Sequence, residues 1–207
     1  MTTRPAVVLL RAVSWPAVLS LTAGATMLGA AGVALGPASL GSTPLAAAAT
    51  LLAAAAAFTL DEPSAAIVDL TPTSPARRTT VRAHALPVPL LVGVGLATAI
   101  HARDAALSTT DLAVAVVGNV VLGFAAACAA RRRTAEPGIL IATTITVAFV
   151  VAPLISPIAR RIQLFPASPN APLSSTTWWT LVIVGGILTI AVSTHPRLRD
   201  ATSSIRR

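Results

Sequence analysis

Apolar residues are gathered into six long runs along this chain, and shorter polar stretches separate them. Each run approaches the roughly 20 consecutive apolar residues that a helix needs to cross the hydrocarbon core of a bilayer. The pattern therefore predicts an all-α, polytopic membrane protein whose 207 residues form one transmembrane domain. The six predicted spans lie at about 13–36, 44–60, 86–101, 111–130, 137–157 and 176–194.

Composition supports this interpretation. The chain is 55% hydrophobic and 11% charged, with a mean hydropathy of +0.79. Soluble globular domains carry about 25% charged residues. The small charged fraction therefore favours a protein whose surface is mostly covered by lipid.

All fifteen basic residues are arginine, and this excludes several activities. A Walker A loop needs a lysine on the nucleotide phosphates, and Schiff-base catalysis needs a lysine amine. No nucleotide-binding or catalytic site is therefore expected in this chain, and any ATP with its Mg²⁺ would bind to a partner. The net charge of +8 does not indicate nucleic-acid binding, because the arginines border apolar runs without interleaved aromatic residues.

The arginines also predict an orientation. If the spans alternate in direction, one side of the membrane holds twelve arginines and the other side holds Arg103, Arg160 and Arg161. Arginine is enriched in cytoplasmic loops, so we expect both termini in the cytoplasm. The first apolar run is longer than the roughly 7–15 residues of a signal-peptide core, which favours a retained span.

Residues 61–85, DEPSAAIVDLTPTSPARRTTVRAHA, form the longest polar interval between spans on the predicted cytoplasmic side. One short helix is expected after Pro63, and a second is expected to begin at Pro75 with Ser74 as its cap. The segment carries both apolar and charged residues, as a docking element for a cytoplasmic partner would. The alternative is a solvated loop whose arginines only set the topology.

Few residues within the spans suggest chemistry. Gly29, Gly32 and Gly36 favour close helix packing in lipid. Asn119 is the strongly polar residue inside the fourth span, and a structural hydrogen bond is favoured over a place in a transport pathway. The three histidines lie at different span ends, which predicts no metal site, and the single cysteine, Cys128, forms no intrachain disulfide.

The arrangement resembles the membrane subunit of ABC-2 type exporters, particularly short actinobacterial permeases. Those permeases have six spans, cytoplasmic termini, an N-terminal interfacial helix, a coupling helix between spans two and three, and external helices before span six. The corresponding segments here are residues 4–11, 61–85 and 158–175. The stretch LDEPSAAIVDLTPTSPARRTTVR is similar to the "LDDP…P.S…RR" run of those permeases.

This resemblance implies a permease subunit of the bacterial cytoplasmic (inner) membrane that pairs with a second permease, identical or related. Separate cytoplasmic ABC ATPase subunits would bind residues 61–85 and supply ATP and Mg²⁺. Polar contacts with the ATPase are expected from Asp61, Glu62, Asp69, Arg77, Arg78 and Arg82, and apolar contacts from Ile67 and Leu70. Nearly charge-free spans suit an apolar or amphiphilic substrate.

Three other functions are compatible with a polytopic membrane protein. A non-transporting accessory or assembly subunit would need no nucleotide-binding partner. A proton-coupled carrier is disfavoured because all seven acidic residues lie at span ends or in loops. An intramembrane enzyme is disfavoured because the spans contain no cluster of serine, histidine and acidic residues.

Overall fold

The fold is described from a computed structural model of the chain, for residues 13–35, 43–61, 75–103, 108–131, 133–134, 136–151 and 175–194. Within these ranges the chain forms helices and no strand. The helices are α2 (Trp15–Leu35), α4 (Thr43–Phe58), α6 (Pro75–Ala83), α7 (Pro87–Arg103), α8 (Thr109–Ala130), α9 (Pro137–Val151) and α11 (Ser175–Thr194).

Each predicted apolar run overlaps one of these helices along most of its length, and α6 lies in the polar segment 61–85. As predicted, α6 begins at Pro75. A turn at residues 84–86 separates α6 from α7, which begins at Pro87.

Four helices are long and apolar enough to cross a membrane, and two apolar helices are shorter. The long ones cover Trp15–Ala34, Thr109–Ala130, Thr176–Thr194 and Ala76–Arg103, the last of which takes α6, the turn at residues 84–86 and α7 together. The shorter ones cover Pro44–Phe58 and Pro137–Ala148. The described part of the chain is therefore a helical bundle of membrane-protein character.

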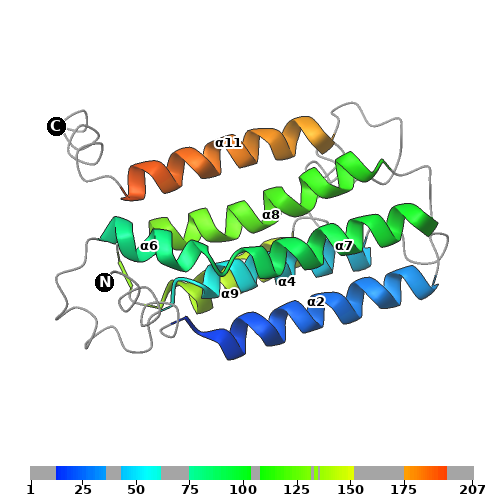
Figure 1. Cartoon of the computed structure of the whole chain (residues 1–207), viewed down its shortest axis with the longest axis horizontal. Helices are drawn as coiled ribbons and strands as arrows, with labels where there is room; N and C mark the ends of the chain where they lie inside the picture. The colour runs from blue at the N-terminus through cyan, green and yellow to red at the C-terminus, as the bar shows by residue number, and fades with distance from the viewer. Residues whose placement is uncertain are drawn as a thin grey trace, which may run out of the picture.

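The six apolar helices lie side by side and run in alternating directions along the long axis of the bundle (Figure 1). α4 and α8 occupy the centre: α4 packs against α2, α7, α8 and α9, and α8 packs against α4, α7, α9 and α11. The C-terminal ends of α4 and α8 and the N-terminal ends of α7 and α9 lie at one end of the bundle, called the Asp61 end below. The N-terminal ends of α8 and α11 lie at the opposite end, called the Asp111 end.

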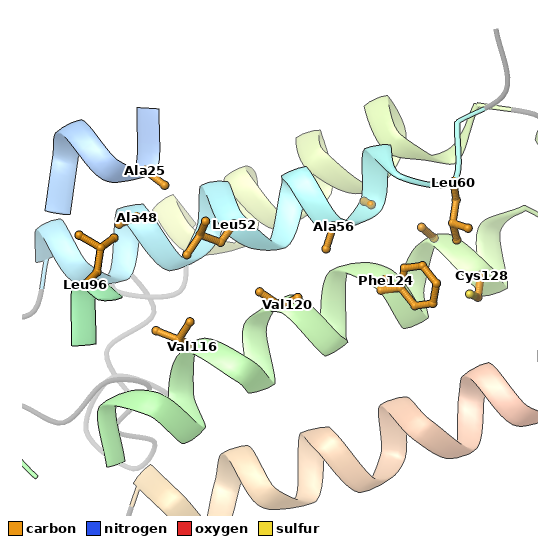
Figure 2. Close-up of a cluster of buried hydrophobic side chains, with 12 residues drawn as sticks. Ala25, Ala48, Leu52, Ala56, Leu60, Leu96, Val116, Val120, Phe124 and Cys128 are labelled. Carbon is orange, nitrogen blue, oxygen red and sulfur yellow. The ribbon is translucent and has the colours of Figure 1, made fainter. Parts of the chain in front are cut away.

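The alanine-rich helix α4 is buried along most of its length. Its side chains from Ala53 to Ala57 are at most 2% exposed. Alanine gives little hydrophobic gain from burial, but its small volume lets neighbouring helices approach closely. Figure 2 shows the resulting layer between α4 and α8, with Leu60, Phe124 and Cys128 gathered at the Asp61 end.

These two helices approach each other closely at Gly123 of α8. A Cβ atom at this position would overlap the backbone carbonyl of Ala53 in α4. The obstacle is backbone rather than a movable side chain, so the spacing of the two central helices depends on the absence of a side chain at Gly123.

The outer helices expose large apolar side chains over much of their surface. Examples are Met27 of α2 at 74% exposure, Leu91 of α7 at 73% and Leu181 of α11 at 63%. A soluble monomer rarely exposes such an extensive apolar surface. These side chains therefore lie where lipid tails or another membrane subunit would cover them.

We expect Gly123→Ala to lower the free energy of unfolding by about 1–3 kcal/mol, because the added methyl group forces α4 and α8 apart. Gly185→Ala is the matched control, since a Cβ at Gly185 of α11 meets no atom within 4 Å. That control should leave stability unchanged or raise it by up to about 1 kcal/mol through helix propensity. Unfolding in mixed detergent micelles measures both, and equal effects would contradict the close approach at Gly123.

Candidate functional site

The Asp61 end of the bundle contains a group of buried polar residues. Three consecutive backbone bonds of the i→i−3 type, from the N–H groups of Thr59, Leu60 and Asp61, extend α4 by a tighter turn. This turn adds about 6 Å to the roughly 24 Å of α4 and carries Asp61 beyond the apolar helix. Asp61 is only 4% exposed there.

The Asp61 carboxylate binds the beginning of α9. The backbone N–H of Gly138 donates a hydrogen bond of 2.5 Å to Asp61 Oδ1. Pro137 is the first residue of α9 and has no N–H, so Gly138 supplies the first free donor of that helix. A carboxylate is well suited to this position, because the N-terminus of a helix carries partial positive charge.

Arg82 of α6 lies beside this contact. Its side chain is fully buried, and Nη1 donates a hydrogen bond of 2.8 Å to the carbonyl oxygen of Leu60. Leu60 directly precedes the polar segment 61–85 and Arg82 lies near the end of that segment, so this bond joins its two ends. Because Asp61 also holds α9, one small region connects α4, α6 and α9.

The electrostatics of Asp61 reflect these neighbours. Burial raises the pKa of the Asp61 carboxyl above its usual value, and the hydrogen bond from Gly138 opposes that increase. The negative charge of Glu136 raises the pKa further, whereas the positive charge of Arg82 lowers it. The net effect is an increase, so the folded protein favours the protonated form of Asp61 more than the unfolded chain does.

The structure separates the predicted coupling residues into two groups. Asp61, Arg78 and Arg82 are buried, and Arg77 is exposed on α6. The hydrogen bonds identified for Asp61 and Arg82 are intramolecular, and contact of these side chains with a partner stays a prediction. Glu62, Ile67, Asp69 and Leu70 lie outside the described residues.

Two of the predicted packing glycines contact neighbouring helices. A Cβ at Gly29 would lie 2.5 Å from Leu96 Cδ2 of α7, and a Cβ at Gly32 would lie 2.8 Å from Pro44 Cβ of α4. Gly36 lies outside the described residues. Gly29 thus lies at a close contact with α7, and Gly32 lies at a close contact with α4.

Asn119 is 5% exposed within α8 and donates a hydrogen bond of 2.9 Å from Nδ2 to the carbonyl oxygen of Ala115. This bond lies within its own helix, one turn away. A place of Asn119 in a transport pathway stays a prediction.

The Asp111 end contains a second carboxylate, that of Asp111, which links α8 to α11. Ser108 is the N-cap of α8 and accepts a hydrogen bond from the backbone N–H of Asp111. The hydroxyl of Thr176 donates to Asp111 Oδ1, which joins the first turns of α8 and α11. Throughout the described ranges, no group of three or more His, Cys, Asp or Glu residues could hold a metal ion.

Sequence reasoning missed the main contact of this site. Asp61 and Gly138 are 77 positions apart, and the donor is a backbone group that has no side-chain signature. The available signal was Pro137-Gly138 directly after Glu136, a helix start without a Ser, Thr, Asp or Asn N-cap of its own.

No protein-family model matches this chain, and comparisons with curated proteins and with solved structures also gave no match.

We expect Arg82→Ala to lower the free energy of unfolding by about 2–4 kcal/mol, because it leaves a cavity and removes the donor to Leu60. Arg77→Ala removes the same side chain from an exposed position of the same helix and should change stability by no more than about 0.5 kcal/mol. Unfolding in mixed micelles compares the two variants. Equal losses would show that Arg82 has no special structural role.

Proposed function

We propose that this chain is the membrane-spanning permease subunit of an ATP-driven exporter, with six spans and both termini in the cytoplasm. Residues 61–85 dock separate ATPase subunits, and a second permease, identical or related, completes the translocation pathway. The observation that carries the proposal is the connection of the polar segment to the bundle through Leu60, Asp61 and Arg82. A partner bound to residues 61–85 can move the transmembrane helices only if the segment is attached to them, and these hydrogen bonds attach it to α4 and α9.

The charges of the chain support the same arrangement. Arg77 is exposed on α6, which is an amphipathic helix at the Asp61 end. The chain has no lysine for a Walker A loop, so the nucleotide belongs to another subunit. Basic residues concentrate on the side that the positive-inside rule assigns to the cytoplasm, where ATPase subunits reside.

The exposed surface of α9 supports an apolar or amphiphilic substrate. Thr143, Thr144 and Thr146 are exposed there among apolar residues. The hydroxyls of Thr144 and Thr146 donate to the carbonyl oxygens one turn earlier, so their polarity is largely satisfied within the helix. A pathway bordered by such a surface is weakly polar and uncharged.

The topology is tested by labelling with a membrane-impermeant maleimide in a Cys128→Ala background. Arg77→Cys and Arg103→Cys place single thiols at exposed positions near opposite ends of the bundle. We expect Arg103→Cys to react in intact cells and Arg77→Cys to react only after permeabilisation. The reverse pattern would place the Asp61 end outside and refute cytoplasmic docking.

The docking function is tested by purifying the tagged chain from its native host in mild detergent. An ATPase with a Walker A motif should co-elute with the wild-type chain. We expect Arg77→Glu to reduce this recovery by about five- to thirtyfold, since reversal of one charge at an interface costs on the order of 1–2 kcal/mol. The same substitution at Arg103, near the other end of the bundle, should leave recovery unchanged.

A second variant tests the part of the segment that precedes α6. Leu70→Asp should also remove the ATPase while the amount of folded chain in the membrane stays constant. Recovery of the wild-type chain without any ATPase would contradict the exporter proposal. It would favour a non-transporting accessory or assembly subunit instead.

A further inference from the structure

The start of α9 is capped by a distant carboxylate, whereas the start of α8 is capped by its own preceding residue. Ser108 caps α8 from three positions before Asp111, but Asp61 binds Gly138 across 77 positions of sequence. The anchoring of the first turn of α9 thus depends on the position of the end of α4.

The contact at Gly138 leaves no spare space. A Cβ at this position would lie 2.5 Å from Asp61 Oδ2 and 2.7 Å from Phe58 Cδ1. The bare backbone of Gly138 is therefore what allows the carboxylate to reach the helix end. The bond from Arg82 to the Leu60 carbonyl holds the residue before Asp61 and limits the positions that the carboxylate can adopt.

The charged groups that act on the Asp61 carboxylate have opposing effects. Arg82 of α6 attracts its negative charge, and Glu136, directly before α9, repels it. The positive end of the α9 dipole also attracts the charge. Burial favours the neutral acid, which keeps a carbonyl oxygen that can still accept the bond from Gly138.

We propose that Asp61, Arg82 and Gly138 form a proton-sensitive clasp that anchors the first turn of α9 to α4 when Asp61 is protonated and releases it more readily when Asp61 is ionised. This proposal goes beyond the exporter function and does not depend on it. The clasp would make the mobility of α9 respond to the pH on the side of the membrane that the Asp61 end faces.

The direction of the pH effect follows from the linkage between proton binding at Asp61 and closure of the clasp. In the closed clasp the Asp61 carboxyl is buried and its pKa is raised, whereas in an open clasp the carboxyl is solvated and its pKa is near 3.8. The closed state therefore binds the proton more tightly. Its extra stability is fully present below pH 3.8 and is lost as the pH rises through the raised pKa.

Hydrogen–deuterium exchange of the purified full chain tests the clasp through a peptide that covers residues 136–141. Asp61→Asn keeps the oxygen acceptor and cannot ionise, so it represents the protonated form. At pH 7.5 its exchange should be slower than that of the wild-type chain, by about tenfold for each unit by which the clasp raises the pKa of Asp61. At pH 4 the two proteins should differ much less.

Asp61→Ala removes the acceptor and should have the opposite effect. Exchange of the same peptide should be about tenfold faster than in the wild-type chain at pH 7.5, because one hydrogen bond of ordinary strength is lost. The difference should be larger at pH 4, where the wild-type clasp is more stable. Asp111→Asn changes the carboxylate at the other end of the bundle and should leave exchange of residues 136–141 unaltered.

The proposal is overturned if Asp61→Asn and Asp61→Ala change the exchange in the same direction, or if the ratio of Asp61→Asn to wild type does not depend on pH. An equal effect of Asp111→Asn would also overturn it, because the response would then be global. Asn has nearly the same side-chain volume as Asp, so a change of exchange in Asp61→Asn cannot come from a change in volume.

Discussion

The close packing of α4 against α8 is the constraint on which the rest of the bundle depends. Gly123 lets the backbone of α8 meet the backbone of α4 at Ala53, and the alanines of α4 pack beside Leu52 against the apolar face of α8. Helices in lipid associate through close van der Waals packing, because the surrounding tails are as apolar as the side chains. The two central helices thus form a narrow, inflexible core around which α2, α7, α9 and α11 are placed.

That narrow core also explains where the polar chemistry lies. The buried polar side chains of Asn119 in α8 and Thr50 in α4 each donate a hydrogen bond to a carbonyl oxygen of their own helix. The polar contacts between helices are found at the ends, where α4 extends to Asp61 and where Thr176 meets Asp111. The end at Asp61 is the one that joins a long polar segment, which makes it the natural place for control by a partner or by protons.

The apolar pattern predicted the helices well: α2 covers 15–35 against a predicted run of 13–36, and the start of α6 followed from Ser74-Pro75. Tertiary contacts were not predictable in the same way. Gly93 and Gly95 are two positions apart on one helix, yet a Cβ at Gly93 would overlap Val116 and a Cβ at Gly95 would meet nothing. The burial of Asp61 and Arg82 likewise depends on helix ends that are distant in sequence, so both residues looked like surface charges.

The most direct test of this account is labelling of the chain in bilayers by phospholipids that carry a photoactivatable diazirine in the acyl tail, followed by peptide mapping. The account predicts strong labelling of exposed side chains such as Met27, Leu91 and Leu181 and almost none between residues 45 and 57 of α4. Labelling of α4 as strong as that of α2 or α11 would contradict it, because the alanine-rich helix would then face lipid instead of α8.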